Sequence, residues 1–210
     1  MAQDRAVRRR AAHLGPEKRR PLILDSALQV YLAHGYRGTS MQAVADAAGV
    51  TKPVVYECFR NRDELLLALL GREEKRLFDA VIAALPKMPD FENLEALIGQ
   101  GLEAFLIAAT EAPDSWRVVF ESSRTSDSPV AKRVRAARET ILGRLRDLVV
   151  MYLATIKVED TERKAPVLAE LLASICESCG RMLIVEKQPW TPAELAAYVS
   201  RLMTLGVKRA

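Results

Sequence analysis

Apolar residues recur at helical spacing along most of the chain, and this periodicity limits the possible folds more than any other feature. Between Phe91 and Thr110 apolar side chains follow one another at intervals of three and four residues, as they do along one face of an α-helix. The same spacing returns between Val134 and Leu153. No run alternates between apolar and polar residues as a strand would, so the sequence predicts an all-α fold of about nine helices.

Length and composition predict a protein that folds without disulfide bonds or a structural metal ion. The chain has 210 residues, and half of them are apolar, which is enough for a sizeable core. We therefore expect no metal and no cofactor. The three cysteines Cys58, Cys176 and Cys179 make no even-numbered disulfide framework. No apolar run approaches the roughly 20 residues that span a bilayer, so we expect a cytoplasmic protein.

Positive charge is concentrated at the N-terminal end. Residues 1–62 contain eleven Lys and Arg against five Asp and Glu, whereas residues 63–210 contain twenty against twenty-two. This asymmetry favours a polyanionic partner for the first third of the chain, either nucleic acid or an anionic membrane surface. A tail at Arg5–Arg10 that only aids solubility is the alternative.

The stretch MQAVADAAGVTKPVVYECFR predicts two short helices joined by a tight turn. Gly49 can take the left-handed conformation that such a turn requires. Val55 and Cys58 are three residues apart and mark the buried side of the second helix. Thr51 is placed to cap that helix, and Pro53 lies in its first turn, where a missing N–H costs no hydrogen bond. This is the spacing of a helix-turn-helix, although any two short helices in a bundle can share it.

The outer side of the second short helix has the chemistry of a DNA-contacting surface. A helix N-terminus and the Tyr56 hydroxyl can bind phosphate, and Lys52 can reach a guanine edge or a phosphate. Pro53 and Val54 can contact thymine methyl groups. With Thr51 at its start, this helix is predicted to bind double-stranded DNA.

Residues Arg20 to Leu66 resemble the DNA-binding domain of the TetR family of bacterial transcriptional regulators. The matching features are Ile23, Ala27, Tyr31, Gly35-Tyr36, Thr39-Ser40, Ala45, Gly49-Val50, Tyr56, Phe59 and the run Asn61-Arg62-Asp63-Glu64-Leu65. The resemblance implies a three-helix DNA-binding domain at 20–66, a helical ligand-binding and dimerisation domain at 67–210, and a basic arm at 1–19. It also implies DNA contacts from Ser40, Gln42, Lys52, Pro53, Val54, Tyr56 and Arg62. Cys58 stands where many members have histidine, and we expect it in the core.

The resemblance further implies a repressor that binds a palindromic operator as a homodimer and is released by a small-molecule effector. The last two helices are expected to form the dimer. Residues 166–186 carry a second apolar stripe with small residues, which would face a partner subunit together with the last helix. The residues of this expected face are Val167, Leu171, Ser174, Ser178, Leu195, Val199, Leu202 and Gly206.

Large or adaptable side chains on several C-terminal helices are candidates for the effector pocket, although each such side chain is more often plain core. They are Phe105, Trp116, Phe120, Glu121, Met151, Tyr152, Cys179 and Met182. Cys176 and Cys179 form a single CxxC without a second pair, which does not predict a zinc site.

The sequence disfavours two other classes of protein. The chain has only two histidines, His13 and His34, and it lacks a nucleophile elbow, a phosphate loop and a metal-spaced cluster, so an enzyme is not expected. A helical interaction or membrane-surface protein would use the basic end on lipid. Such a protein needs a broad apolar face, whereas the outer side of the two short helices is polar. We therefore expect no membrane partner.

Overall fold

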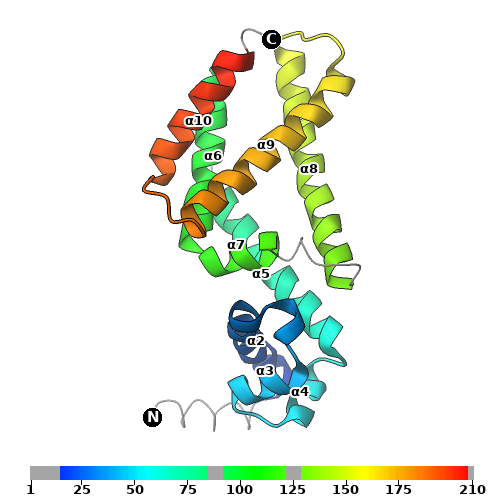
Figure 1. The fold of residues 1–210 in the computed structure, drawn as a ribbon. Helices are drawn as coiled ribbons and strands as arrows, with labels where there is room; N and C mark the ends of the chain where they lie inside the picture. Colours follow the sequence, from blue (N-terminus) through cyan, green and yellow to red (C-terminus); the bar gives the residue numbers. More distant parts are fainter. Residues whose placement is uncertain (1–14, 85–91, 122–128, 208–210) are drawn as a thin grey trace. The chain divides into compact units, whose positions relative to one another are not determined.

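The computed structural model describes residues 15–84, 92–121 and 129–207, and in these ranges it contains nine helices and no strand (Figure 1). The predicted all-α class is therefore confirmed. The helices are α2 (Pro16–Gly38), α3 (Met41–Ala48), α4 (Lys52–Cys58), α5 (Arg62–Ala84), α6 (Leu94–Glu111), α7 (Pro113–Glu121), α8 (Pro129–Thr155), α9 (Thr161–Ile184) and α10 (Pro192–Val207). No helix in the described ranges is long and apolar enough to cross a membrane.

The chain divides into two compact units. The N-terminal unit comprises Met1–Glu74 and Arg117–Val134, and the C-terminal unit comprises Lys75–Trp116 and Arg135–Ala210. The N-terminal unit extends beyond the predicted boundary at residue 66, because the first half of α5 inserts Leu65, Leu66, Leu69 and Leu70 into its core.

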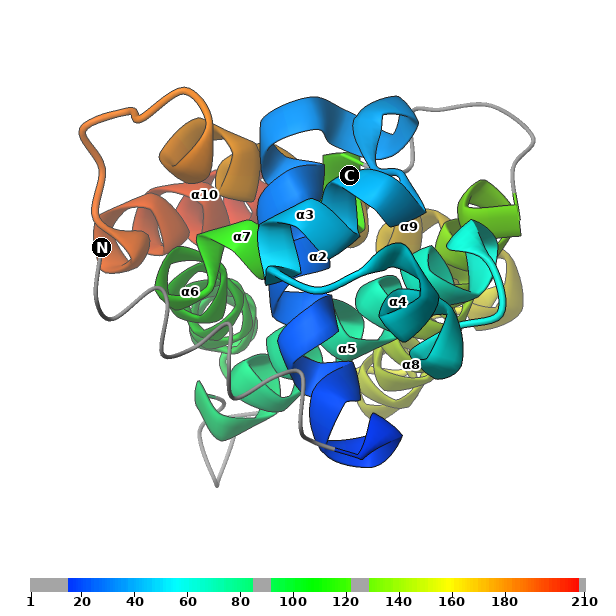
Figure 2. The same cartoon turned by 90° about the horizontal axis from the view of Figure 1, so that it is seen from below.

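One hydrophobic core holds the N-terminal unit together. It contains Ile23 and Ala27 of α2, Val44 of α3, Val55 of α4 and the fully buried Phe59. Helices α3 and α4 pack against each other and against α2, as the view in Figure 2 shows. Helices α2, α3 and α4 thus each bury an apolar face against the other two.

Polar contacts hold α5 on α2 within the same unit. The guanidinium of Arg72 donates to Asp25 Oδ1 at 2.6 Å and to Glu73 Oε1 at 2.7 Å. The side chain of Glu73 is fully buried, so this charge-assisted bond compensates for the loss of water around its carboxylate.

The turns of the helix-turn-helix follow the predicted glycines. Gly35 has a φ of 66° inside α2 and bends the chain there, and the Thr39 hydroxyl donates to its carbonyl at 2.8 Å. Ser40 caps α3 by accepting a hydrogen bond from Ala43 N at 3.1 Å. Gly49 ends α3 in the left-handed conformation, also with a φ of 66°.

Thr51 lies at the predicted N-cap position of α4 but does not make the predicted capping hydrogen bond. Thr51 is the N-cap residue of α4 and has an extended backbone, but its side chain makes no capping hydrogen bond. Pro53 lies in the first turn as predicted. Helix α4 is therefore held mainly by its buried side and by its neighbours.

In the C-terminal unit, α6 packs against α9 and α10. Their shared cluster contains Leu102, Leu106, Cys179, Leu195 and Ala196. A second cluster, of α8 and α9 with the loop between them, contains Val149, Leu153 and Ala165. Arg138 of α8 also joins α8 to α9, because it donates to Glu170 Oε1 at 2.6 Å and to Glu177 Oε1 at 3.2 Å.

The exposed apolar residues of α9 and α10 differ in part from the residues that were predicted to face a partner subunit. Leu195 is buried and Val199 packs on the same cluster, so both face the core of their own subunit, because α10 lies against α6 on that side. The exposure of Gly206 lies outside what the structure describes. Apolar side chains at least half exposed on α9 and α10 are Val167, Leu171, Tyr198, Leu202 and Leu205.

We predict opposite effects of two glycine-to-alanine substitutions in the C-terminal unit. A Cβ at Gly180 would lie 2.6 Å from Trp116 Nε1, whereas a Cβ at Gly143 would meet no atom within 4 Å. Gly180→Ala should lower the free energy of unfolding by about 1–3 kcal/mol through overpacking. Gly143→Ala should raise it by about 0.5–1 kcal/mol through helix propensity. Denaturant titrations would measure both, and a gain in stability for Gly180→Ala would contradict the close packing.

The two N-caps of the helix-turn-helix should also differ. Ser40→Ala removes a capping hydrogen bond and should lower the free energy of unfolding by about 1 kcal/mol. Thr51→Ala removes no such bond and should change it by less than about 0.5 kcal/mol. The measurement is denaturant unfolding without DNA, and equal losses for the two variants would show that Thr51 caps α4 after all.

Candidate nucleic-acid interface

The predicted contact residues of α4 share one exposed surface. Lys52, Pro53 and Tyr56 are exposed, with Tyr56 46% accessible, and Val54 is half-buried. Thr51 is exposed at the start of the helix. Lys52 Nζ lies 6.0 Å from the centre of the Tyr56 ring, since the two residues are one helical turn apart. The structure therefore brings together a cation, a phenol and apolar surface at the start of α4.

The first turn of α3 supplies two further exposed residues. Ser40 and Gln42 both face solvent, but each already has an intramolecular hydrogen bond. Ser40 Oγ caps α3, and Gln42 Nε2 donates to Asp46 Oδ1 at 2.8 Å. A DNA contact by Gln42 would have to share or replace its bond to Asp46.

Arg62 does not lie on this exposed surface. Its guanidinium stacks on the Tyr36 ring, with 4.3 Å from Cζ to the ring centre. It also donates to the carbonyl of Tyr36 and, at 2.5 Å, to the carbonyl of Thr39. A planar guanidinium can make all three contacts at once, whereas lysine could not. In this structure Arg62 holds the turn between α2 and α3, and the predicted phosphate contact stays a prediction.

The first turn of α2 contributes contacts that the sequence analysis missed. Arg19 Nη1 donates to Glu57 Oε2 at 2.7 Å, and Arg20 Nη1 donates to the carbonyl of Cys58 at 2.6 Å. Arg20 also stacks over Phe59 at 4.3 Å. The predicted basic arm at residues 1–19 therefore overlaps α2, which begins at Pro16. A proline followed by an acidic residue is a helix-start pattern that could have revealed this.

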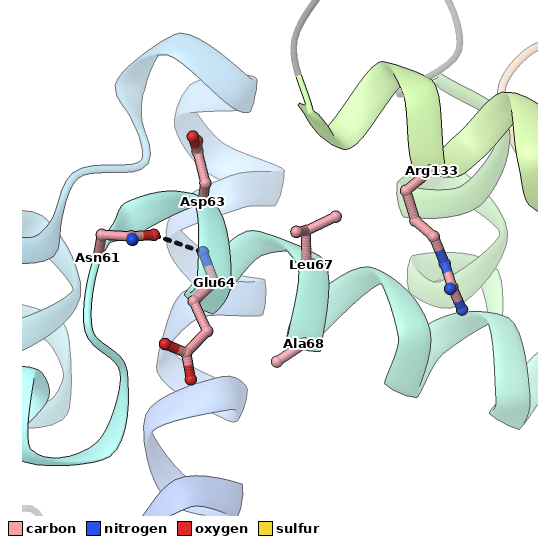
Figure 3. Close-up of a pocket in the computed structure, with 6 residues that line it drawn as sticks. All are labelled: Asn61, Asp63, Glu64, Leu67, Ala68 and Arg133. Carbon is pink, nitrogen blue, oxygen red and sulfur yellow. Dashed lines mark hydrogen bonds between the residues drawn. The ribbon is translucent and has the colours of Figure 1, made fainter.

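A shallow hollow of about 580 Å³ lies beside the start of α5 (Figure 3). Its lining includes Asn61, Asp63, Glu64 and Arg133. Asn61 Oδ1 accepts from Glu64 N at 2.8 Å, and Glu64 Oε2 accepts from Arg60 N at 2.9 Å. Asn61 and Glu64 thus cap α5, so this part of the polar lining serves the helix start.

The predicted pocket residues do not form one group. Phe105 and Cys179 belong to the α6, α9 and α10 cluster, and Trp116 is buried against Gly180. Tyr152 packs in the other cluster of the C-terminal unit, and Phe120 packs against the core of the N-terminal unit.

The remaining predicted pocket residues are Met151, Met182 and Glu121. Met151 is half exposed and Met182 is half-buried. The side chain of Glu121 lies outside the described residues. Phe105 and Cys179 are thus the two predicted pocket residues that share one described cluster, and the effector pocket itself stays a prediction.

The cysteines are buried or half-buried free thiols. Burial, with smaller contributions from the neighbouring Cys179 and Glu177, raises the pKa of Cys176 to about 12. Burial also raises the pKa of Cys58 and of Cys179. A protonated thiol is a poor nucleophile and a poor metal ligand. Among the described residues no three potential metal ligands gather.

Comparison with known proteins agrees with this geometry. Residues 23–69 match the TetR_N family model, described as bacterial regulatory proteins of the tetR family. The HTH-type transcriptional activator FasR of Mycolicibacterium smegmatis is 33% identical over 142 residues, which are 67% of this chain and 63% of FasR. The HTH-type transcriptional repressor KstR of Mycobacterium tuberculosis is 34% identical over 97 residues, 42% of each chain. The chain thus spans less than two thirds of the length of these relatives.

The fold is also similar to that of a solved regulator. FadR of Bacillus subtilis, crystallised in complex with stearoyl-CoA, superposes with a TM-score of 0.64 over 86% of this chain and 95% of FadR, at 15% identity. This likeness concerns the fold. Together with the turn geometry of α3 and α4, the family match and the relatives show that the chain belongs to the TetR family of bacterial regulatory proteins.

Proposed function

We propose that the protein is a dimeric regulator of transcription that binds a palindromic DNA operator and is released from it by a small-molecule effector. The observation that carries the proposal is the exposed surface of α4, where Lys52, Pro53 and Tyr56 lie together on a helix that its neighbours hold in place. The N-terminus of α4 and that of α3 would both face DNA, with α4 in the major groove. Ser40, Gln42, Thr51 and Val54 complete the proposed contact surface.

A dimer follows from the exposed apolar side chains of α9 and α10. Val167 and Leu171 of α9 and Leu202 of α10 are each more than half exposed, which is costly for large aliphatic side chains. A two-fold axis through this surface would bury each set against its copy. The two α4 helices of such a dimer would contact half-sites one helical turn of DNA apart, roughly 34 Å.

The effector would act on the C-terminal unit. Helix α5 belongs to the N-terminal unit up to Glu74 and to the C-terminal unit from Lys75, so a ligand that changes the packing of α5 can change operator affinity. The coupling expected for such a switch is about 1–3 kcal/mol. Stearoyl-CoA, the ligand in the FadR structure, is the first compound to test.

Repression is the proposed direction of control, because a dimer bound at an operator can block transcription. Of the two relatives, KstR is named a repressor and FasR an activator. Transcription from a promoter that contains the recovered operator, with and without the protein, would measure the direction.

The experiment that tests DNA recognition is selection of bound duplexes from a random pool at about 150 mM salt, which suppresses non-specific phosphate binding. The proposal expects a palindrome. Binding that selects no motif and fades as salt rises would overturn it.

Two variants should separate phosphate contacts from base contacts on α4. Tyr56→Phe removes a phenol hydroxyl that can bind phosphate, and it should weaken binding to all sequences alike. Lys52→Ala should relax the preference at one base pair by about 1–3 kcal/mol. Affinities for the operator and for single-base variants would measure both. The reverse pattern would show that the two roles are exchanged.

The dimer surface can be tested with a matched pair of leucines. Leu202 on α10 is 60% exposed and Leu148 on α8 is 54% exposed, but only Leu202 lies on the proposed dimer surface. Leu202→Glu would bury two carboxylates near the two-fold axis and should weaken dimerisation by about 100-fold or more. Leu148→Glu should leave it unchanged. Sedimentation equilibrium measures both, and a monomeric wild-type protein or equal effects would contradict the proposal.

A further inference from the structure

Glu57 is an acidic residue on the surface that we propose faces DNA. It follows Pro53 by one helical turn, and both residues are exposed, so the two lie on the same side of α4. DNA phosphates repel a carboxylate. An acidic side chain at this position therefore weakens binding to every sequence unless a neighbouring cation or a specific base compensates for it.

Arg19 provides such a cation from a different helix. Its side chain is only 8% exposed, whereas that of Glu57 is 55% exposed. Arg19 Nη1 donates to Glu57 Oε2 at 2.7 Å. Within the part of the chain that the structure describes, Glu57 Oε1 accepts no hydrogen bond. The pair thus combines a fixed, mostly buried donor with a carboxylate that keeps one oxygen accessible.

The first turn of α2 is itself anchored on α4, which makes Arg19 a rigid support. Arg20 donates to the carbonyl of Cys58 at 2.6 Å and stacks over Phe59. The Cys58 thiol lies 3.7 Å from the carbonyl oxygen of Pro16. These contacts on either side of Arg19 limit how far its guanidinium can move relative to α4.

We propose that Glu57 is a base-contacting residue that accepts a hydrogen bond from a cytosine amino group in the major groove, and that Arg19 is its positioning residue. An ionised carboxylate is only an acceptor, and cytosine N4 presents a donor. Adenine presents its amino donor beside the N7 acceptor, which repels the second carboxylate oxygen. The inference rests on the proposed DNA-binding function.

The first test compares the motifs selected by the wild-type protein, Glu57→Gln and Glu17→Gln at about 150 mM salt. Glu17 is an exposed acidic residue in the first turn of α2. Its replacement therefore removes one negative charge, as Glu57→Gln does, but leaves the Arg19–Glu57 pair intact. The wild-type motif should require cytosine at one position of each half-site, by about 5- to 150-fold. Glu57→Gln should lose that requirement and accept adenine, which glutamine can bind with two hydrogen bonds. Glu17→Gln should retain the wild-type motif.

The second test separates positioning by Arg19 from a merely structural role. Arg19→Met should reduce the cytosine preference at the same position, Arg19→Lys should restore part of it, and Lys18→Met, at an exposed neighbour, should not change it. In a Glu57→Gln background Arg19→Met should have no further effect on that position. Circular dichroism and thermal unfolding of each variant would verify that it is folded.

The outcomes distinguish this inference from the proposed function. If Glu57→Gln selects the wild-type palindrome with unchanged base preference, the inference is overturned and the proposed function stands. If Arg19→Met lowers affinity for all sequences equally, including in the Glu57→Gln background, the positioning role is overturned. A wild-type protein that selects no motif overturns both proposals.

Discussion

Burial of Val55, Cys58 and Phe59 is the interaction on which the rest of the proposed function depends. Helix α4 has seven residues, too few for a helix to be stable by itself in water. Val55 and Phe59 are fully buried against α2, α3 and α5. Because the stability of α4 comes from this buried side, its outer residues are free to be chosen for contact with DNA. The missing Thr51 cap shows the same dependence on neighbours.

Arginine side chains add polar contacts between the helices that the core of the N-terminal unit packs together. Arg72 joins α5 to α2, Arg62 joins the start of α5 to the turn before α3, and Arg20 joins α2 to the end of α4. Each guanidinium bonds backbone carbonyls or carboxylates in the N-terminal unit. Two of them, Arg62 and Arg20, donate to backbone carbonyls at helix ends, which lack intrahelical partners. The orientation of α4 is therefore held by apolar burial from inside and by arginines at its edges.

Much of the fold and part of the site could be predicted from local patterns. Helical periodicity predicted the class, Gly49 predicted the turn, and the exposed positions of Lys52, Pro53 and Tyr56 followed from the spacing of Val55 and Cys58. The errors concern long-range contacts. Leu195 has the spacing of either an interface or a core residue, and only its contact with α6 shows which it is. Local patterns also gave no sign that Arg62 stacks on Tyr36, and its phosphate contact stays a prediction.

The sequence by itself determined that the chain is helical, where its turns fall, and which side of α4 is apolar, because these properties depend on residues within one or two helical turns of each other. The tertiary structure alone decided that Arg19 meets Glu57, thirty-eight positions away, and that Phe120 joins the core of the N-terminal unit. Local spacing carries no information about such partners. They are set when separate helices pack, since burial of apolar surface determines which side chains meet.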